Sequence, residues 1–324
     1  MGKQEFSIPA LTSRLQTEAD AYRLLEELRW GGHPSTCPHC GGADRCFFLN
    51  PANGVSRKTR TGSVSERRVW KCGHCRKQFS VLTGTIFHGT KIPLRTWLLV
   101  VLEMCASKHG VAAREIERKY DLTAKSAWFM LHRIREAMRR EPLASLLTGT
   151  VVADETWIGG NPKNKHRTKP GRQGKTDKTP VLALVDRRTG EVRSRVVPDV
   201  TAKTLHRALQ AEVDMPATTL HTDGHLSYVS VAPSMGRHEW VDHKRGEYVR
   251  GGVSTNLAET FFSQLKRSVD GTHHHVSSKH LPRYLAEFDY RFSTRKLTDS
   301  ARLRDLMSRT EGRRLSYHPL DRGE

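Results

Sequence analysis

Residues 151–160 read VVADETWIGG, and this stretch indicates the fold of roughly the second half of the chain. A run of small and apolar residues that contains a single aspartate, Asp154, is typical of a buried strand that carries an acid. A charge in such surroundings is costly unless something binds it. We therefore expect a strand with Asp154 as a functional residue, and with the next residue, Glu155, on the opposite face of that strand.

Downstream of this strand, the sequence alternates between strand and helix patterns. The segments predict, in order, two strands joined by a tight turn at Thr189–Gly190 (180–200), a helix (201–213), a strand (217–224), a short helix near Leu226, a strand (239–241) and a helix (254–269). Three strands, helix, strand, helix, strand, helix is the element order of a ribonuclease-H-like α/β core.

Two more acids stand at the ends of elements in this order. Asp223 ends the strand over 217–224, and Glu259 lies in the first turns of the helix over 254–269, with 35 residues between the two acids. Phosphodiester cleavage by two magnesium ions needs a cluster of carboxylates that are distant in sequence and meet in the fold. We interpret Asp154, Asp223 and Glu259 as catalytic acids and metal ligands. Asp186 is expected to be an exposed competitor.

The helix that carries Glu259 holds further polar residues. Asn256 lies one turn before Glu259 and can hydrogen-bond substrate or a metal-bound water. Lys266 lies two turns after Glu259 on the same face, and Arg267 follows it. We expect Asn256, Lys266 and Arg267 to contact DNA phosphates or neighbouring groups.

Upstream, two CxxC pairs predict a structural zinc site. CPHC (37–40) and CGHC (72–75) each point two thiolates at one tetrahedral ion, and 31 residues separate the pairs. The expected zinc ligands are Cys37, Cys40, Cys72 and Cys75. A disulfide framework is the alternative. Cys46 and Cys105 are interpreted as core residues, and His39 and His74 as solvent-facing.

The remaining N-terminal sequence is helical. Periodicity predicts helices over 16–30, with Thr17 as cap, and over 94–108. The segment 110–138 then reads as helix, short turn at 120–122, helix, which is the pattern of a helix-turn-helix; a plain helical hairpin is the alternative. We expect the second helix to expose a basic side that contacts DNA through Arg133 and Arg135.

Composition narrows the function classes. Lys plus Arg number 54 against 34 acids, a formal net charge of +20, which favours a nucleic acid partner over a merely basic globular protein. No apolar run approaches the ~18–20 residues of a membrane helix, and no signal stretch opens the chain, so we expect a cytoplasmic, nucleoid-associated protein. Seven basic residues in Lys163–Lys178 predict an exposed loop, either solvated or in contact with DNA.

Together these motifs resemble bacterial insertion-sequence transposases of the DDE type that carry an N-terminal zinc ribbon. The matching stretches span about residues 25–295 in the family's order: RWGGHPSTCPHCGG, WKCGHCRKQFSVLTGTIF, VADETWIGG, LHTDGHLSY, NLAETFFSQLKR and HVSSKHLPRYLAEFDYRF. The resemblance implies a ribonuclease-H-like domain, dependence on Mg²⁺ or Mn²⁺, terminal inverted repeats and target DNA as partners, and a homo-oligomeric complex. It also implies that Asp154, Asp223 and Glu259 form the catalytic triad.

The expected organisation has five parts: a helical segment (1–35), a zinc ribbon (36–90), a helix-turn-helix-like region (91–145), a ribonuclease-H-like catalytic domain (146–300) and a basic C-terminal tail (301–324). Three functions fit it. The first is a transposase that cleaves DNA and transfers 3′ ends to a target. The others are a DNA-binding regulator with an inert ribonuclease-H-like domain, and a nuclease that cuts without rejoining.

Overall fold

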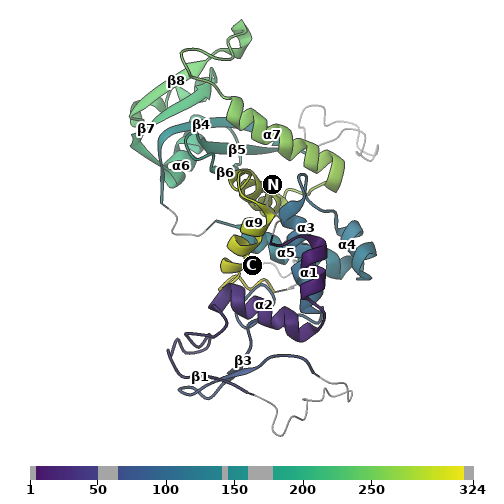
Figure 1. Cartoon of the computed structure of the whole chain (residues 1–324). Coiled ribbons are helices and arrows are strands. Elements are labelled where there is room, and N and C mark those ends of the chain that lie inside the picture. The colour runs from purple at the N-terminus through teal and green to yellow at the C-terminus, as the bar shows by residue number, and fades with distance from the viewer. Residues whose placement is uncertain (1–4, 50–64, 141–144, 160–177, 317–324) are drawn as a thin grey trace. The chain divides into compact units, whose positions relative to one another are not determined.

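The computed structural model describes residues 5–49, 65–140, 145–159 and 178–316 (Figure 1). The chain divides into two compact units, each described here by itself. The first comprises residues 1–107, 111–138 and 297–324, and the second comprises residues 108–110 and 139–296. Among the described residues, no helix combines the length and apolar character needed to cross a bilayer.

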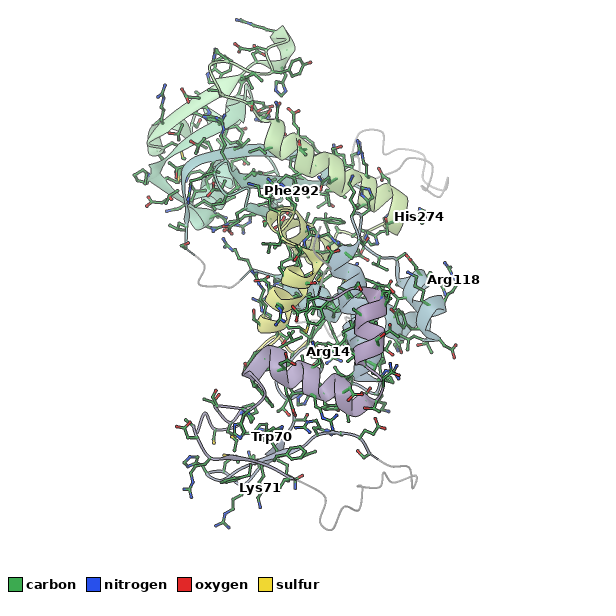
Figure 2. All side chains as sticks on the ribbon, in the orientation of Figure 1. Arg14, Trp70, Lys71, Arg118, His274 and Phe292 are labelled. Carbon is green, nitrogen blue, oxygen red and sulfur yellow. The ribbon has the colours of Figure 1, made fainter. Side chains whose placement is uncertain are left out.

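The first unit is mainly helical and contains a small antiparallel sheet. Its elements are α1 (Ile8–Arg14), α2 (Glu18–Trp30), β1 (Cys46–Phe48), β2 (Trp70–Cys72), β3 (Gln78–Phe79), α3 (Leu94–Ala106), α4 (Ala113–Tyr120), α5 (Ala124–Met138) and α9 (Asp299–Ser308). The sheet has the order β1-β2-β3. Along β2 the side chains alternate, so that Trp70 and Cys72 are buried and Lys71 is exposed (Figure 2).

Helix α2 forms where the sequence predicts it, because both of its ends are encoded locally. Thr17 and Asp20 make a reciprocal capping box at the N-terminus, and Gly31 ends the helix in the left-handed region at φ 65°. The helix contributes Glu26, which is 2% exposed and accepts hydrogen bonds from Trp70 Nε1 at 2.8 Å and from Arg68 Nε at 2.7 Å. These bonds tie the zinc-ribbon sheet to α2.

The predicted C-terminal tail is wrong in its first residues. Residues 301–308 belong to α9, whose Leu303, Leu306 and Met307 are buried and which packs against α2, α3 and α5. Just before them, the Ser300 hydroxyl accepts a hydrogen bond from the backbone N–H of Phe6 at 2.8 Å. Helix α9 therefore completes the core of the first unit, and the proposed boundary at residue 300 falls inside this helix.

Helices α4 and α5 form the predicted helix-turn-helix-like pair. Asp121, at φ 49°, ends α4, and the Thr123 hydroxyl accepts a hydrogen bond from the backbone N–H of Ser126 at 3.2 Å, which caps the start of α5. The two helices pack directly on each other.

The second unit is an α/β layer structure. Its elements are β4 (Leu147–Ile158), β5 (Thr179–Asp186), β6 (Val192–Val196), α6 (Ala202–Glu212), β7 (Val213–Asp223), η3 (Leu226–Tyr228), η4 (Ala232–Ser234), β8 (Arg237–Val241), η5 (His243–Arg245), α7 (Asn256–Ser268), η6 (Val269–His273) and α8 (Leu281–Ser293). The sheet has the order β6-β5-β4-β7-β8. The first three strands are antiparallel, and β4, β7 and β8 run parallel. This is the predicted ribonuclease-H-like core.

Each face of the sheet is covered by its own hydrophobic core. Val152, Val181 and Ala183 pack with the apolar residues of α7 and α8 on one face. Val151 and Ala153 pack with α6 and Tyr228 on the other. Because side chains alternate along a strand, Val152 faces one core, whereas its neighbours Val151 and Ala153 face the other.

The turn between β5 and β6 departs from one expectation. Asp186 was expected to be exposed, but only 6% of it is exposed. Its carboxylate accepts hydrogen bonds from the backbone N–H groups of Arg188 at 2.7 Å and Thr189 at 2.9 Å. The turn then closes at Gly190, whose φ of 76° favours glycine. Asp186 is thus a turn residue, which removes it as a competitor for the catalytic acids.

Candidate active site and zinc centre

The four cysteines of the ribbon converge as predicted. Their sulfur atoms all lie within 4.8 Å of one another, and two of the separations, Cys37 to Cys75 and Cys40 to Cys72, are 3.8 Å. Four thiolates held about 2.3 Å from one ion at the corners of a tetrahedron are also about 3.8 Å apart. The donor set therefore fits a closed, structural Zn²⁺ site.

The backbone supports these sulfurs as thiolates. Hydrogen bonds from the backbone N–H groups of Cys75 and His74 lower the pKa of the Cys72 thiol to about 6. The histidines inside the two turns are exposed, and their Nε2 atoms lie 3.2 Å from backbone carbonyls of Gln78 and Ala43 rather than at the sulfur cluster. Cys46 lies outside the cluster of ligands, and burial raises the pKa of its thiol.

The acids Asp154 and Asp223 lie on adjacent parallel strands. In the register of β4 and β7, Val152 is opposite His221. Asp154 and Asp223 are each two residues further along their strands, so both project from the same sheet face as Val152. That face is covered by α7, which packs on β4 and carries Glu259 in its first turn. The fold thus brings the three predicted acids to one region.

The electrostatics of Asp154 reflect this convergence. Burial raises its pKa to about 7, and the negative charges of Glu155, Asp223 and Glu259 contribute in the same direction. Carboxylates that repel one another in a partly buried site are stabilised by a hard divalent cation, for which oxygen ligands are preferred. Among the described residues, however, only the cysteines bring three ligand atoms within 4.8 Å.

Glu259 is the most exposed of the three acids, with 43% of its side chain exposed. Its carboxylate accepts a hydrogen bond from the Thr255 hydroxyl at 2.8 Å, and His243 Nε2 lies 3.5 Å from the same oxygen. Thr255 is the N-cap residue of α7, but its side chain makes no cap hydrogen bond. His243 begins the short 3-10 helix η5, whose sequence has no periodic pattern, and it meets Glu259 only in the fold, so the sequence does not predict it.

Glu155 faces away from Asp154, as predicted. Its carboxylate accepts a hydrogen bond from the hydroxyl of Tyr228 on the opposite face of the sheet. Burial raises the pKa of Glu155 to about 7, and the charge of Asp223 raises it further. Tyr228 is fully buried. The sequence predicts a short helix near Leu226, but it gives no signal that pairs Tyr228 with Glu155.

The DNA-contacting residues predicted on α7 are accessible. Asn256, Lys266 and Arg267 are all exposed, and they share the helix with Glu259. The basic stretch Lys163–Lys178 lies, except for Lys178, outside the described residues.

The predicted exposure of the α5 arginines is wrong. Only 5% of Arg133 and 1% of Arg135 is exposed. Arg133 donates a hydrogen bond to the backbone carbonyl of His88 at 2.6 Å, and its guanidinium lies 5.3 Å from the Trp97 ring centroid. Burial lowers its pKa to about 10. The exposed basic residues of the helical pair include Arg114, Arg118 and Lys119 of α4 (Figure 2 labels Arg118).

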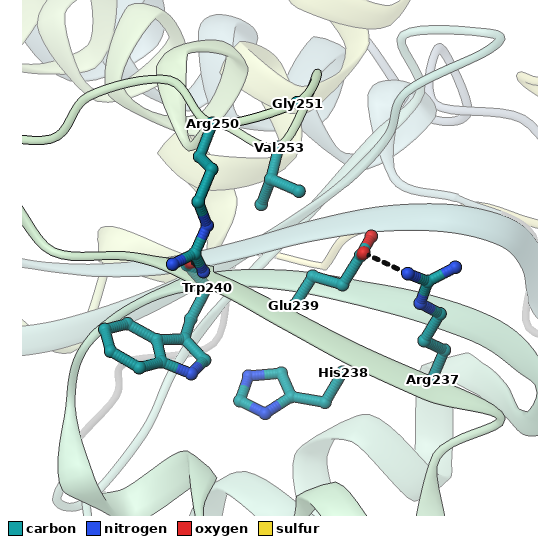
Figure 3. Close-up of a pocket in the computed structure, with 7 residues that line it drawn as sticks. All are labelled: Arg237, His238, Glu239, Trp240, Arg250, Gly251 and Val253. Carbon is teal, nitrogen blue, oxygen red and sulfur yellow. Dashed lines mark hydrogen bonds and ion pairs between the residues drawn. The ribbon is translucent and has the colours of Figure 1, made fainter.

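A pocket of about 380 Å³ opens beside β8. Figure 3 shows His238 and Trp240 on one side of the strand and the Arg237–Glu239 ion pair, at 2.7 Å, on the other. Arg250 donates a hydrogen bond to the Trp240 carbonyl, and its guanidinium lies 5.3 Å from the indole centroid. The pocket is polar, and none of the predicted acids lines it.

Comparisons with known proteins agree with the two-part architecture. The family model of the ISXO2-like transposase domain matches residues 146–293, and the transposase zinc-ribbon model matches residues 16–78. A Halobacterium salinarum protein described as an uncharacterized protein in transposable element ISH50 is 29% identical over 287 residues, covering 85% of this chain and 90% of that protein.

Two solved structures are also similar, at scores too low to carry an argument. One is a simian T-cell lymphotropic virus intasome in complex with PP2A regulatory subunit B56 gamma, with 14% identity, a TM-score of 0.27 and coverage of 58% of this chain and 64% of that one. The other is a pre-cleavage Mos1 transpososome, with 12% identity, a TM-score of 0.27 and coverage of 95% and 98%.

Proposed function

We propose that this chain, whose two parts match the transposase zinc-ribbon and ISXO2-like transposase domain families, binds the terminal inverted repeats of its element, cleaves DNA and transfers the 3′ ends to target DNA. The observation that carries the proposal is the meeting of Asp154 on β4, Asp223 on β7 and Glu259 on α7. Burial raises the pKa of Asp154, and the charges of Asp223 and Glu259 contribute in the same direction, which supports a site where carboxylates share cations.

The three acids are the proposed ligands of Mg²⁺ or Mn²⁺. Bound there, the metals would stabilise charge on the attacking and leaving oxygens of an in-line displacement at phosphorus. Asp154 and Asp223 would bind the metals from two adjacent strands of the sheet, which hold both carboxylates in place. Glu259 would close it from α7, with Thr255 orienting its carboxylate through the 2.8 Å hydrogen bond.

Helix α7 offers a path for the DNA backbone from this site. Lys266 is seven residues after Glu259, which is almost two full turns, so both side chains lie on the same side of the helix. The exposed Lys266 and Arg267 would bind phosphates, and Asn256 would hydrogen-bond a nucleotide near the reacting bond. Because Arg133 and Arg135 are buried, we assign DNA contact in the helical pair to the exposed Arg114 and Arg118 of α4 instead.

The zinc ribbon has a structural role in this proposal. A four-thiolate site with no open position binds its ion to hold the fold and leaves none for chemistry. We propose that the ribbon and the α4–α5 pair recognise element ends, that the ribonuclease-H-like domain performs the chemistry, and that a homo-oligomer brings two ends together. The large basic excess would support this binding to DNA.

The test is an assay that separates binding, cleavage and joining. Zinc-loaded protein is mixed with Mg²⁺, a labelled duplex carrying the inverted repeat that flanks its gene, and a target plasmid. The proposal predicts joined product. Cleavage without joining would identify a nuclease. Specific binding without cleavage in both Mg²⁺ and Mn²⁺ would identify an inert regulator.

A further inference from the structure

We propose that Glu155 and Tyr228 are positioning residues that fix the two strand-borne acids, Asp154 and Asp223, relative to each other. Neither Glu155 nor Tyr228 faces the region where the acids meet, since both contribute to the opposite side of the sheet. The inference rests on the proposed function, because it concerns how the same site is held ready for metal ions.

A continuous set of hydrogen bonds joins the two aspartates through Glu155 and Tyr228. The backbone N–H of Glu155 donates to Asp154 Oδ1 at 2.8 Å, and the Glu155 carboxylate accepts from the Tyr228 hydroxyl. The backbone N–H of Tyr228 donates to the His225 carbonyl at 3.1 Å. The backbone N–H of His225 in turn donates to Asp223 Oδ1 at 3.1 Å.

The loop that follows Asp223 needs such an anchor. Leu226 and Val229 are 82% and 64% exposed, whereas Tyr228 between them is fully buried in the core with Val231 and Met235. The ring of Tyr228 thus anchors this turn in the core beneath the sheet. Its hydroxyl donates a hydrogen bond to the carboxylate of Glu155, the residue next to Asp154.

This arrangement suits a site that must bind cations. Acids that repel one another adopt a metal-binding geometry only if the surrounding structure holds them, and groups that orient the ligands without touching the metal typically change metal affinity by about 10–100-fold when they are removed. Removing the Tyr228 hydroxyl leaves the Glu155 carboxylate buried without this partner. Both the turn that positions His225 and the backbone beside Asp154 then lose a constraint.

The decisive variant is Tyr228→Phe, which deletes one oxygen and keeps the packed ring. Its matched control is Tyr120→Phe, because the Tyr120 hydroxyl also donates to a carboxylate, Glu103, at 2.6 Å, between α4 and α3. Mn²⁺ binding to the full-length, zinc-loaded protein is measured by calorimetry, and the binding that Asp154→Asn abolishes is taken as the site's own. We expect Tyr228→Phe to weaken that binding about tenfold and Tyr120→Phe to leave it unchanged.

A second pair of variants keeps the proposal testable if Tyr228→Phe folds poorly. Glu155→Gln retains an acceptor for the Tyr228 hydroxyl, so its Mn²⁺ affinity should stay within about threefold of wild type, whereas Glu155→Ala should lose about tenfold. Equal losses in Gln and Ala variants would make Glu155 a metal ligand and overturn its assignment as a positioning residue. Unchanged Mn²⁺ affinity in Tyr228→Phe, with lower thermal stability alone, would reduce the pair to a structural role.

Failure of the proposed function has a different signature. If wild-type protein binds no Mn²⁺ that depends on Asp154, the acids are not a metal site and both proposals fall. If wild type binds Mn²⁺ and joins DNA, and Tyr228→Phe requires no more metal than wild type for half-maximal joining, only the positioning proposal fails.

Discussion

Asp154 and Asp223 occupy equivalent places on adjoining parallel strands, each two residues beyond the paired positions Val152 and His221. The register of β4 against β7 therefore determines that the two carboxylates lie on the same face of the sheet. A slip of one residue would move one of the acids to the face where Tyr228 packs. The apolar residues that precede Asp154 (151–153) therefore contribute to the site, because their burial on the two faces fixes which face its carboxylate occupies.

Loss of one zinc ligand should unfold the ribbon. In Cys72→Ser the tetrahedral sulfur set is broken, and because metal binding in such a site is folding free energy, we expect zinc to be released and the melting of the N-terminal unit to move down sharply. Metal content by atomic absorption and thermal unfolding monitored by intrinsic tryptophan fluorescence, to which the buried Trp70 contributes, would check this. Cys46→Ala is the control and should keep its zinc. A Cys72→Ser protein that retained one equivalent of zinc would contradict the four-cysteine assignment.

Stability without divalent metal should fall as pH rises. The pKa of Asp154 is about 7 in the folded protein, well above the unfolded value of about 3.9. Between these values the folded state binds more protons than the unfolded state, so the free energy of unfolding declines from about pH 4 to 7 and then levels off. One such group contributes at most about 1.4 kcal/mol per pH unit.

The Asp154→Asn variant tests this assignment. It should show a shallower decline than wild type in chemical denaturation of Mg²⁺-free, zinc-loaded protein between pH 5 and 8. Part of the slope should persist, because the pKa of Glu155 is also raised to about 7. An identical slope in wild type and Asp154→Asn would mean that Asp154 ionises freely.

Arg133 should matter for stability and not for DNA contact. Arg133→Ala removes the hydrogen bond to the His88 carbonyl and the packing on Trp97, so we expect a loss of about 2 kcal/mol in unfolding free energy. The salt dependence of DNA binding should not change. The exposed Arg118→Ala serves as control, with a stability change within about 0.5 kcal/mol. A stable Arg133→Ala protein with a shallower salt slope would restore Arg133 as a DNA contact.

Lys266 should contribute one phosphate contact. In Lys266→Ala, the slope of log K for DNA binding against log salt should fall by about one unit, and affinity should drop similarly for specific and random sequences. Lys203→Ala is the matched control, because Lys203 is exposed on α6, across the sheet from α7. Titrations at several salt concentrations, followed by fluorescence anisotropy, would measure both. Equal slopes for wild type and Lys266→Ala would place Lys266 outside the DNA path.

The sequence predicts most of the element order because its signals are local. Thr17 and Gly31 mark the ends of a helix, and the turn at Gly190 separates two strands. Of the candidate acids, Asp223 ends a strand and Glu259 lies in the first turn of a helix. The CxxC pairs also predict the zinc site directly, since the spacing of the two cysteines within each pair determines how they bind one metal ion.

What the sequence does not reveal depends on long-range packing. A helix-turn-helix pattern predicts that one side of α5 is exposed, but it cannot show that Arg133 finds its partners in Trp97 and His88. Residues 301–308 are rich in charge, which obscured the apolar spacing of Leu303, Leu306 and Met307 that buries α9. Likewise, the pairs Glu155–Tyr228 and His243–Glu259 arise only when separate elements meet.

The most direct measurement of the central claim, that the acids hold catalytic metal ions, is strand transfer by an Asp223→Cys variant in Mg²⁺ and in Mn²⁺. A thiolate is a poor ligand for the hard Mg²⁺ and a better one for Mn²⁺. We predict that joining is lost in Mg²⁺ by at least about 100-fold and is substantially restored in Mn²⁺, while binding to element ends is retained. As control, Asp270→Cys, at an exposed acid beyond α7, should be as active as wild type in both metals. Full activity of Asp223→Cys in Mg²⁺ would contradict the account.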